Sequence, residues 1–124
     1  MSWRNYPKYH SKKVQLDGMT FDSKREAERY IYLKLLQKAG EISDLRCQVE
    51  YELIPNQYGA DVITPTGKKK RGKLLERAVK YKADFTYIED GELIVEDVKG
   101  FKTKDYILKR KMMLFFHGIR IKET

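Results

Sequence analysis

The chain has 124 residues, of which 41% are hydrophobic and 35% are charged, and its formal net charge is +8 at pH 7. This length fits one domain with a core of its own, and the hydrophobic fraction argues against an intrinsically disordered chain. The excess of positive charge predicts a polyanionic partner, of which nucleic acid is the first candidate, although charge alone does not separate this from a merely soluble basic protein.

The number of cysteines and the lengths of the apolar segments indicate the cellular compartment. The only cysteine, Cys47, excludes an internal disulfide bond and fits a reducing compartment, so we expect a cytoplasmic location. No run of 18 apolar residues occurs, and residues 1–12 carry no apolar signal core, so we expect no membrane partner. Residues 1–12 are polar, aromatic and basic, and are predicted to form a flexible arm.

The first expected elements are a hairpin and a helix. Residues 14–22 contain alternating apolar positions around a turn signal, which predicts a short hairpin. Ser23 followed by Glu26 is a capping-box pattern and Gly40 closes the segment, so a helix is expected between them. Glu26 then has two interpretations: a cap residue that returns to the Ser23 amide, or an acid that faces the core sheet.

Residues 46–54 alternate well enough to predict a strand. Gln48 shares its parity with Glu50 and Glu52, so Cys47 is expected on the opposite side, toward the helix. Gln48 has two interpretations of equal weight, a contact to a metal-coordinated water or to DNA, and an amide at a strand edge.

Residues 55–78 are the least regular part of the chain. They contain two prolines, three glycines and a basic run, and are predicted to form a flexible hairpin or flap that orders mainly with nucleic acid. Such cations contact phosphates without carrying sequence information. The run consists of Lys68, Lys69, Lys70, Arg71 and Lys73.

Residues 79–100 are predicted to form two strands joined at Asp90-Gly91, a strong two-residue hairpin signal. This turn pairs residues whose numbers sum to 181, so Asp84 lies directly opposite Asp97. Opposed carboxylates about 5 Å apart repel by about 3 kcal/mol at an effective dielectric near 20. Such a pair is tolerated if one acid keeps a proton or a cation lies between them.

The same register sets the neighbours of this pair. Lys82 faces Lys99 on the face of the two aspartates, and an oxygen-rich pair beside a lysine suits Mg²⁺ or Mn²⁺ better than zinc. The alternative is a solvated polar sheet face. Glu96 competes with Asp97 for the second acid, but its parity places it opposite Phe85, with Tyr81, Ala83 and Val98, so we choose Asp97.

Thr103 is the expected N-cap of a second helix that reaches about His117 and ends at Gly118, and residues 119–122 are expected to form a short last strand. This helix has apolar residues on two sides, so it either packs deeply or also contacts a partner chain, which suggests a homodimer. One stripe holds Tyr106, Ile107, Met113 and Leu114, the other holds Leu108, Met112 and Phe115, and Lys109, Arg110 and Lys111 form a basic edge.

Asp84, twelve further residues, and then Asp97-Val98-Lys99 resemble the motif of the PD-(D/E)XK nuclease superfamily. The chain also resembles a family of small phage-encoded proteins of uncharacterised function within it, most clearly at residues 21–53 and over about residues 10–122 in all. The shared features are a Ser-x-x-Glu-Ala helix start at Ser23, a Gly-x-Ile after the helix at Gly40, and a Gln in the next strand at Gln48.

This resemblance implies an α/β fold with a restriction-endonuclease-like core, in which two helices flank a mixed sheet of four to five strands. It also implies a metal held by Asp84, Asp97 and the Val98 carbonyl, with Glu26 binding a second metal ion or a water ligand of the first. Lys99 would orient or deprotonate the attacking water, or stabilise the transition state; the sequence does not choose among these.

The function implied by the resemblance is a metal-dependent DNA endonuclease, with branched DNA such as Holliday junctions as a substrate by analogy. A different class is a non-catalytic nucleic-acid-binding module, and a third is a phage structural or packaging accessory protein. The cations expected to contact DNA are Lys68, Lys69, Lys70, Arg71, Lys73, Lys82, Lys109 and Lys111.

Overall fold

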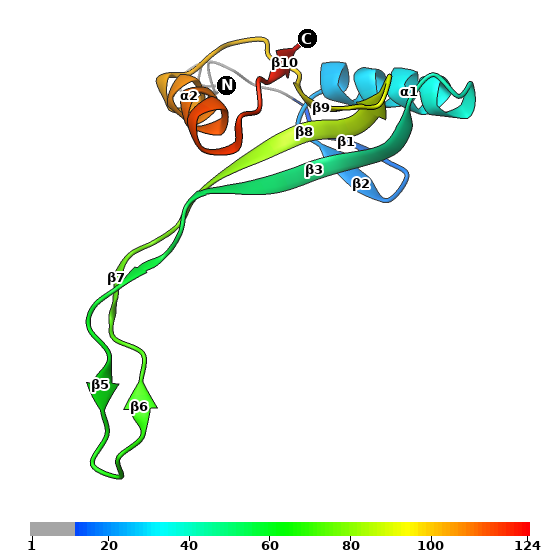
Figure 1. Cartoon of the computed structure of the whole chain (residues 1–124). Coiled ribbons are helices and arrows are strands. Elements are labelled where there is room, and N and C mark those ends of the chain that lie inside the picture. Colours follow the sequence, from blue (N-terminus) through cyan, green and yellow to red (C-terminus); the bar gives the residue numbers. More distant parts are fainter. Residues whose placement is uncertain (1–11) are drawn as a thin grey trace, which may run out of the picture.

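The computed structural model describes residues 12–124, which form two helices beside a twisted sheet and a long arm that projects from it (Figure 1). The elements in chain order are β1 (Val14–Leu16), β2 (Met19–Phe21), α1 (Lys24–Lys38), β3 (Ser43–Ile54), β4 (Gln57–Tyr58), β5 (Val62–Ile63), β6 (Lys69–Lys70), β7 (Leu74–Glu76), β8 (Val79–Glu89), β9 (Glu92–Asp97), α2 (Lys104–His117) and β10 (Lys122–Glu123). The predicted N-terminal arm lies outside the described residues except for Lys12.

The central sheet has the order β10-β9-β8-β3 among the described residues. β3, β8 and β9 are antiparallel neighbours, whereas β10 runs parallel to β9, so the sheet is mixed. The predicted α/β class, with a mixed sheet of four strands and two helices, is therefore confirmed. None of the helices found in residues 12–124 has the length and hydropathy needed to cross a membrane.

The β8–β9 hairpin has the register that its turn predicts. Phe85 pairs with Glu96 and Glu89 pairs with Glu92, so paired residue numbers sum to 181. Asp90 and Gly91 have φ values of 51° and 77°, as a two-residue turn of this kind requires. The next pair along this register, Asp84 and Asp97, lies where β9 ends.

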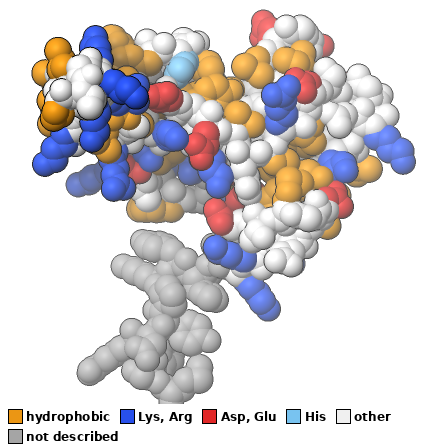
Figure 2. All heavy atoms as spheres, turned by 90° about the horizontal axis from the view of Figure 1, so that it is seen from below, with side chains coloured by type: hydrophobic (Ala, Val, Ile, Leu, Met, Phe, Trp, Pro, Cys, Tyr) orange, Lys and Arg blue, Asp and Glu red, His pale blue; other side chains and the backbone are white. Residues whose placement is uncertain are grey.

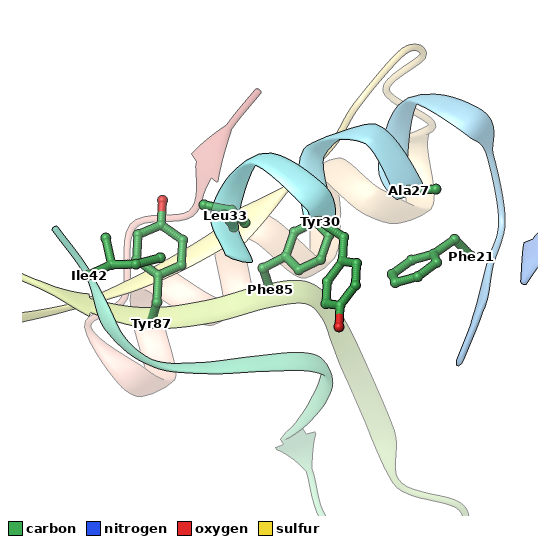
Figure 3. Close-up of a cluster of buried hydrophobic side chains, with 7 residues drawn as sticks. All are labelled: Phe21, Ala27, Tyr30, Leu33, Ile42, Phe85 and Tyr87. Carbon is green, nitrogen blue, oxygen red and sulfur yellow. The ribbon is translucent and has the colours of Figure 1, made fainter. Parts of the chain in front are cut away.

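The first hydrophobic cluster lies between α1 and the sheet. The Ser23 hydroxyl accepts a hydrogen bond from the Glu26 amide at 3.1 Å, which begins α1 as predicted, and Gly40 follows its end with φ +81°. Figure 3 shows the packed side chains, with Tyr30 and Phe85 stacked at a centroid distance of 6.4 Å. The cluster consists of Phe21, Ala27, Tyr30, Leu33, Ile42, Phe85 and Tyr87.

The second cluster lies under α2, which begins at the predicted cap Thr103 and ends at Gly118 with φ +64°. Its buried residues are Leu53, Tyr81, Ala83, Val95, Tyr106, Met113 and Ile121. β8 is therefore shared by two clusters. Glu96 pairs with Phe85, as its parity predicted. Of the residues expected on the same side of the sheet, Val98 packs near α1, and Tyr81 and Ala83 lie under α2.

The last strand differs from its predicted bounds of 119–122. Ile121 is buried in the second cluster and Ile119 packs against it, so this part of the chain is held by side-chain packing. Pairing with β9 begins only at Lys122, opposite Glu96, and continues at Glu123, opposite Asp97.

Residues 55–78 form a hairpin arm that leaves the sheet where Ile54 pairs with Val79 (Figure 1). β4 pairs with β7 near the body and β5 pairs with β6 further out. The two halves of the hairpin approach closely at Gly72, because a Cβ there would overlap the Gly59 carbonyl oxygen. Figure 2 shows Lys and Arg side chains gathered with hydrophobic ones over the end of the arm, at the left.

A buried ion pair joins α1 to β9. Arg29 donates from Nε and Nη2 to the two carboxylate oxygens of Glu96, at 2.7 and 2.8 Å. The Tyr87 hydroxyl and the Thr124 hydroxyl also donate to Glu96, at 2.7 and 3.2 Å. Burial opposes ionisation of Glu96, but these hydrogen bonds outweigh it and lower the pKa of the carboxyl.

We predict that Arg29→Ala lowers the free energy of unfolding by about 3 kcal/mol, because it leaves a buried carboxylate without its cation. Denaturant unfolding at pH 7 measures this change. Lys24→Ala, which removes an exposed cation paired with Glu28 on the same helix, is the control and should cost less than about 0.5 kcal/mol.

The pH dependence gives a second check of the same ion pair. Because the folded-state pKa of Glu96 is lowered, its contribution is present above the unfolded value of 4.5 and is lost as the pH falls. The difference between Arg29→Ala and the parent protein should therefore shrink below about pH 4; a constant difference would contradict this assignment.

Candidate functional site

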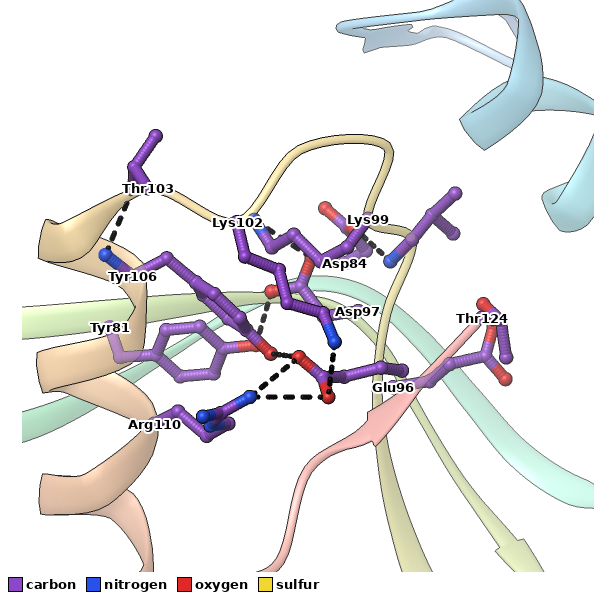
Figure 4. A network of polar contacts seen from close by, with 12 residues as sticks. Tyr81, Asp84, Glu96, Asp97, Lys99, Lys102, Thr103, Tyr106, Arg110 and Thr124 are labelled. Carbon is purple, nitrogen blue, oxygen red and sulfur yellow. Dashed lines mark hydrogen bonds and ion pairs between the residues drawn. The ribbon is translucent and has the colours of Figure 1, made fainter.

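A cavity of about 300 Å³ lies where the first turns of α1 and α2 approach the middle of β8. Its lining contains five carboxyl groups and three lysines, although the whole chain is basic. Figure 4 shows part of this polar network. The lining residues are Asp22, Glu26, Gln48, Tyr81, Lys82, Asp84, Asp97, Lys99, Thr103, Asp105, Tyr106 and Lys109.

Asp84 and Asp97 each offer one carboxylate oxygen to a donor of the protein. The Val98 amide donates to Asp84 Oδ2 at 2.7 Å, and the Tyr81 hydroxyl donates to Asp97 Oδ2 at 2.5 Å. Burial, followed by the hydrogen bond and negative charge of Asp97, raises the pKa of Asp84 to about 8. In the absence of a cation, Asp84 therefore keeps a proton at neutral pH.

Lys99 lies next to this pair. Its ammonium nitrogen is 3.2 Å from Asp97 Oδ1 and 4.2 Å from the centre of the Tyr106 ring. The backbone amide of Lys99 donates to the Thr124 carbonyl at 3.1 Å, which fixes the chain after β9. The side chain is thus held between a carboxylate and an aromatic ring at the cavity wall.

Glu26 reaches the same cavity from α1. Its side chain is buried, and burial together with the charge of Asp22 raises the pKa of its carboxyl. The Ser23 cap uses the backbone amide of Glu26 rather than its side chain. The helix cap and a role for the carboxyl group in the cavity are therefore compatible.

Gln48 lines the cavity from β3 and has an unusual backbone conformation. Its φ is +54°, a left-handed value in the middle of a strand, opposite Asp84 in the β3–β8 register. Its side-chain Nε2 donates to the Thr20 carbonyl at 2.8 Å, which links β3 to β2. Gln48 is therefore an amide on an edge strand that also lines the cavity, and its contact to a metal-coordinated water or to DNA stays a prediction.

The predicted cations divide between the cavity and the rest of the molecule. Lys82 and Lys109 line the cavity. Lys111 instead borders a separate depression beside Arg110 and Arg120. The basic run at residues 68–73 lies on the projecting arm and does not line the cavity that holds the acids.

Several cavity residues were not expected from the sequence. Tyr81 and Tyr106 become site residues only because α2 packs on β8, a contact between segments far apart in the sequence. Asp22 and Asp105 lie beside the two helix caps, a position where acids are common for helix stability alone, so their type carried no functional signal. Thr103 was expected only as a cap.

The donor set at this cavity can be compared with what a hard divalent cation requires. Within residues 12–124, no three acids, cysteines or histidines are gathered as a ready-made ligand group. However, Asp97 Oδ1 is buried and accepts no hydrogen bond from the described residues, and Lys99 is its neighbouring cation. An oxygen left in this state beside two more acids with raised pKa values fits Mg²⁺ or Mn²⁺.

Fold and cavity together define an α/β domain with a carboxylate-lined cavity between two helix starts. The chain belongs to the family described as "Protein of unknown function (DUF1064)", whose model matches residues 6–122. Comparison with curated proteins and with solved structures gave no match.

We predict that Asp84→Asn stabilises the metal-free protein at neutral pH. The folded-state pKa of Asp84 is raised from 3.8 to about 8, so its ionisation costs stability progressively as the pH rises between these values. Asn keeps an acceptor for the Val98 amide but carries no charge. The gain should exceed about 1 kcal/mol at pH 8, equivalent to about 4 °C in Tm, and vanish near pH 4.

Thermal unfolding in EDTA from pH 4 to 8 measures this effect. Glu92→Gln, which neutralises an exposed acid of the same hairpin, is the control and should leave the pH profile unchanged. The assignment of a protonated Asp84 would be refuted if the free energy of unfolding of the parent protein rose steadily from pH 4 to 8 by the same amount as that of Asp84→Asn.

Proposed function

We propose that this protein is a divalent-metal-dependent DNA endonuclease that hydrolyses phosphodiester bonds. The observation that carries the proposal is that Asp84, Asp97 and Lys99 line one cavity with Glu26, a residue from a distant helix. A solvated polar sheet face does not require a helix acid to meet the hairpin acids. The superfamily resemblance of the Asp97-Val98-Lys99 segment points the same way.

Asp84 and Asp97 are the proposed ligands of Mg²⁺ or Mn²⁺, with the Val98 carbonyl and Glu26 as further ligands. The metal would supply positive charge to the scissile phosphate and to the oxygen that leaves. Tyr81 fixes one oxygen of Asp97 through its hydroxyl and leaves the other directed at the site. The Val98 amide fixes Asp84 in the same way.

The lysines have distinct proposed roles. Lys99, held beside Asp97 and the Tyr106 ring, orients the attacking water or stabilises the negative charge of the transition state. Lys82 and Lys109 line the same cavity, where they contact the phosphates on either side of the cleaved bond. Lys111 and the arm cations Lys68, Lys69, Lys70, Arg71 and Lys73 contact the backbone further away.

DNA, including branched DNA, is the proposed substrate, because contacts to phosphates read the shape of DNA rather than its sequence. The proposal includes a cytoplasmic location, consistent with the single free cysteine. It also includes a homodimer through α2, since Leu108 and Phe115 of its second apolar stripe are exposed.

We predict that Asp84→Asn, Asp97→Asn and Lys99→Ala each reduce metal-dependent cleavage by at least about 1,000-fold while DNA affinity changes by less than about threefold. Each substitution removes a group that acts on the reacting phosphate but leaves the arm and helix cations in place. The measurement is cleavage of branched, single-stranded and duplex DNA with Mg²⁺ or with EDTA, together with binding in EDTA.

Glu50→Gln is the matched control, because this exposed acid of β3 pairs with Lys80 on the surface and should leave cleavage unchanged. Cleavage by the parent protein only with metal supports the enzyme. Salt-sensitive binding without cleavage would instead favour the non-catalytic module, and full activity in the three variants would reject the assigned site.

We also predict that Glu26→Gln separates the two roles of this residue. The cap uses the backbone amide, so the substitution should leave the free energy of unfolding in EDTA unchanged or slightly higher, since a buried acid is removed. Cleavage should nevertheless fall by at least about 100-fold. Ser23→Ala is the opposite control: it should cost about 1 kcal/mol of stability with activity retained below the unfolding temperature. Full activity in Glu26→Gln would leave Glu26 with a structural role only.

A further inference from the structure

The arm formed by residues 55–78 carries a charge that its own structure does not need. It contains six lysines and arginines but only two acids, Asp61 and Glu76. The side chains of its four short strands are exposed. Half of the net charge of the chain therefore lies on an extension without a core.

The arm is held by contacts within itself. Its strands pack chiefly on each other, β4 on β7 and β5 on β6. Lys69 pairs with Asp61 at 3.5 Å, and the Arg71 guanidinium lies 4.4 Å from the centre of the Tyr58 ring. A two-stranded hairpin of this kind is only marginally stable in water, so a partner that covers it would stabilise it.

The positive charge of the arm indicates the chemical class of its partner. A second copy of the chain would bring two positively charged arms together, and like charges at close range are unfavourable. A polyanion is complementary over the whole length of the arm. Exposed apolar side chains such as Val62 and Ile63 lie among the cations, and a surface that offers both phosphates and apolar base edges matches this mixture.

The distribution of the cations on the ribbon indicates that the arm binds in a groove of its partner rather than on a flat surface. Lys69 and Lys70 pair with Ile63 and Val62 respectively, so successive residues face opposite sides of the ribbon. Cations consequently lie on both sides of the arm. A ribbon resting on a surface needs them on one side, whereas a ribbon in a groove has a phosphate wall on each side.

The width of the groove identifies the nucleic acid. The major groove of B-form DNA is about 12 Å wide and admits a two-stranded β-ribbon. The major groove of duplex RNA is too narrow for one. Single strands have no groove and would use one side of the ribbon only.

The arm also has a defined reach. It continues β3 and β8, the strands that carry Gln48 and Asp84. At about 3.3 Å per residue, Lys73 and Lys68 lie at most about 36 and 53 Å along the chain from Asp84. On DNA that rises about 3.4 Å per base pair, these distances correspond to about 11 and 15 base pairs.

We propose that the arm is a duplex-DNA reader that lies in the major groove of a flank on one side of the cavity, up to about 15 base pairs from Asp84. This inference rests on the proposed function in taking DNA as the substrate. It adds that the productive substrate includes a double-stranded flank longer than one helical turn. The DNA on the other side of the cleaved bond does not need a double-stranded flank of this length.

Two variants test this in the full protein. The first carries Lys68→Ala, Lys69→Ala, Lys70→Ala and Arg71→Ala. The second replaces residues 60–71 by an Asn-Gly turn, since the hydrogen bond from the Gly59 amide to the Lys73 carbonyl already brings the cut ends together. The control removes as many exposed cations elsewhere, by Lys12→Ala, Lys13→Ala, Lys24→Ala and Lys38→Ala.

Binding is measured in EDTA to duplexes of 8 to 30 base pairs and to single strands, at several salt concentrations. The parent protein and the control should bind 24 base pairs at least about 30-fold tighter than 8, and both arm variants less than about fivefold tighter. In the four-alanine variant, the slope of log K against log salt should fall by about 3.6, at about 0.9 for each of the four lost phosphate contacts.

The proposal is overturned if the arm variants keep the length dependence of the parent protein, or if they lose single-strand affinity as much as duplex affinity. It is also overturned if they keep DNA affinity but change from dimer to monomer in sedimentation, which would assign the arm to a second copy. None of these measurements involves cleavage. If the binding results are as expected but the protein never cleaves DNA, the nuclease proposal fails and the proposal for the arm stands. If the protein cleaves DNA but the binding results differ, the proposal for the arm fails and the nuclease proposal stands.

Discussion

The register of the β8–β9 hairpin is the constraint on which the rest of the structure depends. Because side chains alternate along a strand, a slip of one residue would exchange every residue of β9 between the two sides of the sheet. Glu96 would then lose Arg29, and Asp97 would leave the cavity. Asp90-Gly91 prevents this slip, since two residues with positive φ close the turn in only one register.

Asp97 and Glu96 show what this register achieves. The two acids are adjacent in β9 and both are almost fully buried, yet their surroundings are opposite. Glu96 accepts hydrogen bonds on both oxygens and has a guanidinium partner, so its charge is balanced and its role is to join α1 to the sheet. Asp97 has one oxygen that accepts no hydrogen bond from the described residues; this oxygen lies 3.2 Å from the Lys99 ammonium, and a second acid, Asp84, lies beside it at the cavity. The acid whose two oxygens both accept hydrogen bonds is a structural element, and the acid with an open acceptor oxygen at the cavity is suited to bind a cation.

Local sequence signals predicted a large part of this arrangement, because each depends on neighbours in the chain. The caps at Ser23 and Thr103 and the turn at Asp90-Gly91 are of this kind. The meeting of Glu26 with Asp84 and Lys99 at one cavity was expected from the family resemblance, because no local signal links α1 to the hairpin. The contacts that the sequence did not predict are long-range. Arg29 and Glu96 are 67 residues apart in the sequence. Tyr81, which donates to Asp97, is packed in the second cluster against residues of α2. Gln48 carries no glycine or turn signal that could have predicted its left-handed backbone or its side-chain hydrogen bond to Thr20.

Costs of folding are concentrated at the cavity rather than distributed over the molecule. A non-glycine residue with φ near +54° in a strand, a carboxyl group with its pKa raised by burial, and a buried carboxylate oxygen that accepts no hydrogen bond from the described residues each oppose folding by about 1–3 kcal/mol. Apolar residues at 84 and 97 would remove two of these costs without disturbing the register. A chain shaped by stability alone would therefore not keep them together, and a cation at this point would relieve the charge costs of both acids. The arm follows the same logic on the outside of the molecule: its cations and exposed apolar groups gain nothing from the fold, and both become favourable against a polyanion with apolar edges.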